Sequence, residues 1–406
     1  MSNNQQPVFT KPYYMCFLLF PAGISQGFVT VALPYLLTQH GFTVAEAAAI
    51  VAIGFSANLW RFLWGPVVDL SLSLRKWFWI GLVASNATLL LLCFTALTLK
   101  TVALVSLIAF ISQVAASFTV MPVTGFMARR IEAHKKGLAA GWFQAGSLAG
   151  IGLGGGAGLW LTTHYSAVIA GVVLSILSTL FALVVQLIPD IQHSKEKSIL
   201  QELASMGKDV IAMLKIPIAL FVMVLVMMPI GSGAAANLWS AIATDWHANA
   251  DTVALVTGLL SGLVSVVGCV AGGAIVDKQG VWFGYLGSGI VCALVALVMA
   301  ALPYQPVVYI TGVLAYTFGI GLINAAFSAV ILFAVGKKNV ATKYALLASL
   351  GNLPVVYMTA IDGWAHDKHN SKFMLVTEAV AGTIFVVIAA IVLRYLKARK
   401  LRVYEG

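Results

Sequence analysis

The residue of this chain best placed to bind a charged group is Arg61, which lies about two helical turns inside a long apolar segment. A cation at that depth is unfavourable by about 3 kcal/mol unless it faces water, a partner or a ligand. We therefore predict that Arg61 faces an internal cavity and attracts an anionic group of a substrate. The alternative is a structural role, in which the guanidinium extends to a membrane surface or pairs with Asp69.

Side-chain amides recur within other apolar segments. An amide in an apolar environment needs a hydrogen-bonding partner, which is either a neighbouring helix or a solute. For any single amide the bond between helices is the more frequent role, but as a group they can form a polar lining. The candidate solute-binding residues, besides Arg61, are Gln26, Asn58, Gln113, Gln144, Asn237, Asn324 and Asn352, with Tyr357 as an aromatic that could stack on a substrate.

Two acids, Asp362 and Glu378, are candidates for carrying a proton. A carboxyl group buried in a membrane helix could take up and release a proton during transport. Both residues lie towards the outer ends of their apolar segments, a position that also fits ordinary solvated groups. The four cysteines are dispersed in apolar segments without metal-ligand spacing, so we expect neither a metal nor a cofactor.

A third group of residues stands where two apolar segments end. The run from Gly65 to Asp69, followed by Arg75 and Lys76, predicts a tight turn between two membrane segments. A weaker copy follows in the second half at Gly273 and Asp277. A carboxylate there can accept from helix amides or pair with a cation, so we predict that these residues gate a conformational change.

The amino-acid composition indicates that these segments are surrounded by lipid. Sixty per cent of the 406 residues are hydrophobic and only 9% are charged, and the mean hydropathy is +0.95. These values indicate an all-α integral membrane protein. The cations that give the net charge of +10 lie between the apolar segments. They set the orientation of the protein in the membrane, so no nucleic-acid partner is expected.

Apolar windows of about twenty residues predict twelve transmembrane helices in two six-helix bundles. Their expected ranges are 13–38, 43–68, 77–98, 101–127, 138–162, 166–188, 217–238, 250–276, 282–302, 306–334, 344–363 and 373–394. Lysine and arginine gather on one side of this arrangement. The positive-inside rule therefore predicts a multi-pass protein of the cytoplasmic (inner) membrane with both termini in the cytoplasm.

The longest polar interruption divides the chain into three parts. We expect an N-terminal six-helix bundle over 1–188, a cytoplasmic amphipathic linker over 189–216 and a C-terminal six-helix bundle over 217–406. In the linker, apolar residues recur at helical spacing between charged ones, which is typical of a helix that lies on a membrane surface.

Six plus six segments, with an acidic and basic motif after the second and the eighth, resemble the major facilitator superfamily. The sequences RFLWGPVVD (61–69), AGISQGF (22–28) and GLAAGWFQAGSLAG (137–150) also resemble the branch that contains muropeptide permeases and acetyl-CoA transporters. The chain departs from these patterns at two places. No arginine directly follows Asp69, and Trp142, Phe143 and Gln144 stand where the branch has a Tyr-Arg pair.

The resemblance implies a secondary active transporter that moves a small organic solute, anionic or amphipathic, by alternating access. Its expected partners are the solute, membrane lipids and, as a candidate coupling ion, the proton; we expect a monomer. Broad-specificity efflux by the same fold is one alternative and a non-transporting membrane receptor is another. An enzyme is disfavoured because no metal cluster of His, Cys and Asp, no Ser-His pair and no paired carboxylates occur at one depth. A channel is disfavoured because no filter sequence repeats.

Overall fold

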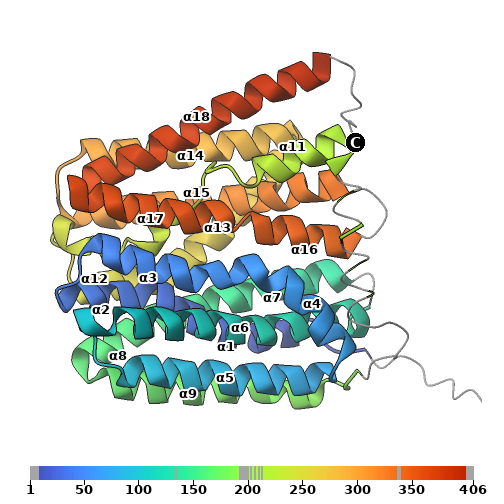
Figure 1. The fold of residues 1–406 in the computed structure, drawn as a ribbon, viewed down its shortest axis with the longest axis horizontal. Helices are drawn as coiled ribbons and strands as arrows, with labels where there is room; N and C mark the ends of the chain where they lie inside the picture. Colours follow the sequence, from blue (N-terminus) through green and yellow to red (C-terminus); the bar gives the residue numbers. More distant parts are fainter. Residues whose placement is uncertain are drawn as a thin grey trace, which may run out of the picture.

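The protein consists of long helices in two bundles that lie side by side. The computed structural model describes residues 9–132, 135–191, 214–335 and 340–398, together with 201, 204, 207, 208 and 211. In Figure 1 the first half of the chain, blue to green, forms one bundle, and the second half, yellow to red, forms the other. No strand occurs in these described ranges.

Most helices match the expected membrane segments closely. The helices of the first half are α1 (Tyr14–Gly27), α2 (Leu33–Gln39), α3 (Val44–Ser56), α4 (Arg61–Leu70), α5 (Leu74–Phe94), α6 (Val102–Arg130), α7 (Lys136–Gly152), α8 (Gly158–His164) and α9 (Ala167–Ala182). The helices of the second half are α11 (Pro217–Leu225), α12 (Ala250–Val253), α13 (Ser261–Gln279), α14 (Val281–Ala301), α15 (Pro306–Val335), α16 (Val340–Leu350), α17 (Leu353–Lys368) and α18 (Ser371–Ala398).

The helices have the length and the surface that a bilayer requires. Ten helical stretches of the described chain are long and apolar enough to cross a membrane. Large aliphatic side chains point outward from them, such as Val83 at 64% exposure and Val270 at 71%. Such a surface is stable only against lipid tails.

Several expected segments are interrupted, and two of them bear on the cavity described below. The segment at 138–162 is continuous from α7 to α8 but contains a π-helical turn, η5 (Leu153–Ala157). The segment at 217–238 is an α-helix only as far as Leu225, so the prediction of a full helix there was wrong. Pro229 has no N–H to donate, and Gly231 and Gly233 adopt positive φ angles of 55° and 73°, which end the helical path.

We call residues 226–233 the broken segment. After it the chain continues through two short 3-10 turns, η7 (Ala234–Asn237) and η8 (Ala243–Trp246). Backbone groups that lack helical partners cannot face lipid. The fold buries this part of the chain accordingly: Ala234, Leu238 and Trp246 have no exposed surface.

The two predicted turns are also corrected. The run from Gly65 to Asp69 belongs to α4, and the chain turns only at Ser71, whose hydroxyl donates to the Val67 carbonyl. In the second half α13 likewise continues through Asp277 to Gln279 and ends at Gly280, with φ of 90°. Both motifs are therefore the last turns of helices.

The structure does not describe every predicted part. Most of the amphipathic linker predicted over 189–216 lies outside the described residues, as do the first eight residues and the side chain of Asp69. In Figure 1 the C-terminal end of α18 lies towards the right, the side on which α4, α11 and α16 also lie. We call this the terminal end of the molecule, and the end near α2, α8 and α12 the opposite end.

Three π-helical segments lie near the crossing of the two bundles. They are η1 (Phe28–Ala32), η5 and η9 (Ala254–Leu260), and η5 contacts both of the others. Glycine permits this approach: a Cβ added to Gly258 of η9 would lie 2.4 Å from the Cα of Gly156 in η5. The bundles therefore meet here backbone against backbone.

Candidate solute-binding site

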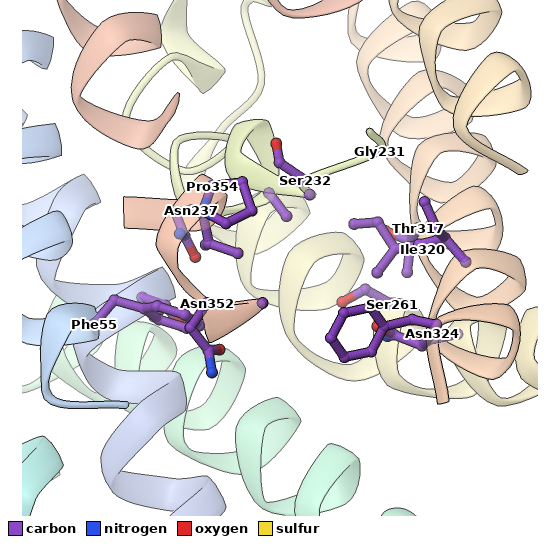
Figure 2. Close-up of a pocket in the computed structure, with 18 of the residues that line it drawn as sticks. Phe55, Gly231, Ser232, Asn237, Ser261, Thr317, Ile320, Asn324, Asn352 and Pro354 are labelled. Atoms are coloured by element: carbon purple, nitrogen blue, oxygen red, sulfur yellow. The ribbon is translucent and has the colours of Figure 1, made fainter. Parts of the chain in front are cut away.

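A cavity of about 390 Å³ lies between the two bundles. Residues of α1, α3 and α7 contribute from the first bundle, and residues of η9, α13, α15, α16 and the broken segment contribute from the second. Figure 2 shows the second-bundle side of this cavity, with Ser232 and Asn237 on one wall and Ser261 and Asn324 on another. Its volume is in the range of small-molecule sites, roughly 300–1,000 Å³.

The lining of the cavity combines amides and hydroxyls with apolar side chains. Among the residues that the structure describes, none that lines it carries a charge. Its polar residues are Gln26, Thr30, Ser232, Asn237, Thr257, Ser261, Ser265, Tyr285, Thr317, Asn324 and Asn352. Phe55, Trp239, Ile320 and Phe327 supply the main apolar surfaces. Such a lining can recognise a polar body with apolar faces through hydrogen bonds.

Four of the predicted solute-binding residues come together here: Gln26, Asn237, Asn324 and Asn352. Asn237 donates to the hydroxyl of Thr359 at 3.0 Å. The amide of Asn352 donates to the carbonyl of Ala348 at 3.0 Å, at the break between α16 and α17. Each amide keeps its carbonyl oxygen as an acceptor for a solute.

The other predicted residues lie outside this lining. Arg61 donates to the side chain of Asn58, which itself donates to the Phe55 carbonyl at 3.1 Å. Gln113 is buried between α6 and α1, where it donates to the Ser25 carbonyl at 3.4 Å. Gln144 is exposed on α7.

Tyr357 connects α17 to the broken segment rather than lining the cavity. Its hydroxyl donates to the carbonyl of Met227 at 3.0 Å. A carbonyl that has lost its helical partner thereby gains a donor. The sequence suggested a stacking role for this residue, and its contact is instead a hydrogen bond that holds an irregular backbone.

The two proton-carrying candidates are buried, which argues against the alternative that they are ordinary solvated groups. Asp362 has no exposed surface and Glu378 is 6% exposed. Both residues lie near the outer ends of their helices, as expected. The broken segment and η7 cover them there and keep them from solvent. Tyr316 and Ser232 both donate to Glu378 Oε1, the latter at 3.3 Å.

The predicted gating residues lie apart from the cavity. The guanidinium of Arg75 donates to the Ile188 carbonyl and its backbone N–H donates to Asp190 at 3.2 Å, within the first bundle. Lys76 and Asp277 are exposed. A Cβ added to Gly65 or Gly273 would meet no atom within 4 Å. None of these described contacts joins the two bundles.

The described polar contacts between the bundles lie at the opposite end. Asp367 of α17 accepts from the backbone N–H of Ala45 at the start of α3, at 3.1 Å. His164 of α8 lies 3.7 Å from Asp251 of α12. Gly363 packs so closely on α3 that an added Cβ would lie 2.3 Å from the Cβ of Ala48. Figure 1 shows α3 and α17 side by side, in accord with these contacts.

A polar cluster supports this closed end within the second bundle. Asp245 of η8 accepts from His366 at 2.9 Å and from the hydroxyl of Ser371. Burial alone would raise the pKa of Asp245, but these hydrogen bonds outweigh it and hold the pKa below its ordinary value. The carboxylate thus fixes the irregular η8 turn to α17 and α18.

Sequence reasoning missed the contribution of the broken segment, which supplies Met228, Ile230, Gly231, Ser232 and Gly233 to the cavity. A signal was present, because one proline and two glycines fall within six residues of an otherwise apolar segment. Interrupted membrane helices often mark binding sites in transporters. Small hydroxyls such as Ser261 and Thr317 carried no comparable signal.

Comparison with known proteins agrees with this architecture. The model of the Major Facilitator Superfamily matches residues 15–359. No curated protein sequence matches the chain. Among solved structures, that of a single-residue mutant of the nucleoside transporter NupG has a TM-score of 0.71 at 14% identity, covering 95% of this chain and 98% of that one.

Two further structures are similar over nearly their whole length. The D-xylose-proton symporter has a TM-score of 0.69 at 13% identity, covering 93% of this chain and 97% of that one. A peptide transporter POT in complex with sulfate has a TM-score of 0.72 at 13% identity, covering 98% and 99%. At these identities the similarity establishes the fold and leaves the substrate open. The muropeptide and acetyl-CoA branch is not among these matches.

Proposed function

The chain belongs to the Major Facilitator Superfamily, and from this premise we propose that it is a secondary transporter for a small, polar organic solute. The solute binds in the central cavity and is recognised by hydrogen bonds rather than by a fixed charge. One observation carries this proposal: the cavity lies between the bundles and is lined by amides and hydroxyls, with no charged side chain among its described residues.

Transport by alternating access requires the cavity to be sealed at one end at a time. The contacts of Asp367 with Ala45 and of His164 with Asp251 support a state that is sealed at the opposite end. We propose that the terminal end faces the cytoplasm, because it carries the cationic residues Arg75, Arg130 and Lys278. The state described here would then exchange solute with the cytoplasm.

The predicted gating residues would act in the other state. When the terminal end closes, the ends of α4 and α13 approach each other, and Asp69, Arg75 and Asp277 are the groups available to pair there. The open space around Gly65 and Gly273 in the present state is consistent with that role.

Entrance counterflow in liposomes tests this function without knowledge of the energy source. Purified protein is reconstituted, the vesicles are loaded with one unlabelled solute, and uptake of the same labelled solute is followed. A nucleoside, a pentose and an uncharged dipeptide form the first panel, because the similar structures are of transporters for such molecules. Saturable counterflow of one class supports the proposal, uptake of unrelated apolar solutes supports broad efflux, and no counterflow supports a receptor.

Comparison of Asn352→Ala with a control variant tests whether the transported solute binds in this cavity. Removing an amide that binds solute is expected to weaken apparent affinity about tenfold, the equivalent of one hydrogen bond. Asn86→Ala is the matched control, because Asn86 donates to Thr179 at 3.0 Å within the first bundle and does not line the cavity. Equal losses in both variants would contradict a direct role for Asn352.

A further inference from the structure

Glu378 has a hydrogen-bond environment that distinguishes its two oxygens. Oε1 accepts from Tyr316 of α15 and from Ser232 of the broken segment. Oε2 is buried and has no hydrogen-bond partner in the described part of the chain. A hollow of about 10 Å³ lies beside the Glu378 side chain, and Tyr316 and Cys292 also line it. This is about the space that one water molecule needs, so a water can lie next to the carboxyl group.

Asp362 is the second acid of the site. It has no exposed surface, and neither of its carboxylate oxygens has a hydrogen-bond partner among the described residues. It lies on α17, near enough to Glu378 on α18 for the two groups to interact electrostatically. A buried carboxylate without donors is strongly disfavoured, and Asp362 has none, so at least one of the two acids holds a proton. The donors around Glu378 favour Asp362 as the neutral partner.

Few other titratable groups face this pair. Tyr316 comes from α15 and Cys292 from α14, and neither helix carries a charged residue. Residues 226–237, which cover the pair, contain no titratable side chain. The charge on Glu378 is therefore balanced by hydrogen-bond donors rather than by a cation on these elements.

Ser232 joins the acid pair to the cavity. Its hydroxyl donates to Glu378. It also accepts, at 3.2 Å, from the backbone N–H of Ala234, which is the first residue of η7. The same residue lines the solute cavity, and η7 also carries the cavity amide of Asn237. In Figure 2 the Ser232 hydroxyl points away from Ser261 and Asn324 on the other wall. A change at Glu378 therefore acts directly on backbone that shapes the solute site.

We propose that Glu378 and Asp362 form a proton-binding site and that Ser232 is the positioning residue that couples its occupancy to the solute cavity. A proton from water forms an O–H bond with Glu378 Oε2, and the carboxylate becomes neutral. The hydrogen bonds from Tyr316 and Ser232 lose their charge assistance, which about halves their strength. The broken segment is then released from α18. This inference rests on the proposed transport function and names its coupling ion.

Two measurements on purified protein in nanodiscs test the proton site without any solute. Infrared absorption of the carboxylic acid C=O group is followed as a function of pH. Hydrogen exchange of a peptide that spans 226–240 is followed over the same range, corrected for intrinsic exchange. The wild type is expected to show one titrating acid band, and exchange of the peptide is expected to rise about tenfold when the band appears.

Three variants separate the proton site from the coupling. In Glu378→Gln the band is lost and exchange stays at its faster value at every pH. In Tyr316→Phe the band is retained and its midpoint moves to higher pH by about one unit, because the carboxylate has lost a donor. In Ser232→Ala the band is retained and its midpoint also moves to higher pH, because the carboxylate has again lost a donor, but exchange of the peptide no longer follows it.

Glu46→Gln is the control acid, because Glu46 belongs to the first bundle and caps its own helix with Thr43. An unchanged band in Glu378→Gln, or a full pH response of the peptide in Ser232→Ala, would overturn the proposal. So would a response to sodium in place of choline at constant pH, since the site would then bind a metal cation. Absence of solute counterflow would reject the transport function and leave these readouts standing.

Discussion

Replacement of Gly258 by alanine should open the end of the transporter that is closed in this structure. A Cβ at position 258 would lie 2.4 Å from the Cα and 2.7 Å from the backbone N of Gly156, across the boundary between the bundles. Both obstructing atoms belong to the main chain, so no side-chain rotation can relieve the clash. The helices must separate, and the π-helical segments η5 and η9 must move with them.

The size of the effect follows from the packing. One extra methyl group in a closely packed interface usually destabilises it by about 1–3 kcal/mol. Because the clash exists only while the bundles are closed here, that energy shifts the balance between the two states by about 5-fold to 150-fold. The variant should therefore favour the state open at the opposite end.

A distance measurement between spin labels detects this shift. Leu99 in the first bundle and Val307 in the second are 61% and 66% exposed, and both lie at the opposite end. With cysteines at these positions and the reactive native cysteines replaced, we expect wild-type protein to give mainly the short distance. Gly258→Ala should add a population at longer distance.

Gly287→Ala is the matched control, on α14 of the same bundle. A Cβ there would meet no atom within 4 Å in the present state, so its distance distribution should equal that of the wild type. The prediction fails if Gly258→Ala folds, as judged by its unfolding temperature, and still gives the same distribution as Gly287→Ala. The close approach of glycines would then be incidental to closure.

Two further predictions concern charged residues. Arg61→Gln should change the affinity for a solute found by counterflow by less than about threefold, because Arg61 does not line the cavity. A loss of affinity of about tenfold or more, which corresponds to about 1.4 kcal/mol, would instead support the anion-binding role predicted from the sequence. Asp245→Asn should lower the free energy of unfolding by about 1–2 kcal/mol at neutral pH, because a partly exposed carboxylate loses its charge-assisted hydrogen bonds. The folded-state pKa of Asp245 lies below its ordinary value. This stabilisation is therefore present at neutral pH and is lost as the pH falls through that pKa. Thermal unfolding curves of the variant and the wild type should converge in acid.

The helices were predictable because bilayer thickness fixes the length of an apolar segment. The expected segments at 43–68 and 101–127 begin within a residue of α3 and α6. Hydropathy windows average over side chains, however, and so they cannot detect a lost backbone hydrogen bond. For that reason the segment at 217–238 was expected to be helical, although Pro229 and Gly231 stop the helix before it crosses.

The candidate site was predictable in part. Amides at Gln26 and Asn352 were identified because a polar group in an apolar segment needs a partner, and they do line the cavity. Arg61 shows the limit of this reasoning: successive helical residues point about 100° apart, so depth in a segment does not determine which face a side chain occupies. The burial of Asp362 and Glu378 depends on a covering segment more than 120 residues away in the sequence, as the bond from Ser232 to Glu378 illustrates.

The shortness of α11 also has a consequence for how the protein is made. Nine helical residues from Pro217 to Leu225 extend about 14 Å, less than half of the hydrocarbon thickness. The backbone that follows is shielded by α14, α15, α17 and α18, which are synthesised later. This part of the chain cannot partition into lipid when it leaves the ribosome, so we expect it to wait beside the insertion machinery until the final helices arrive. A chain cut before Ser371 should for the same reason be recognised as incomplete and degraded.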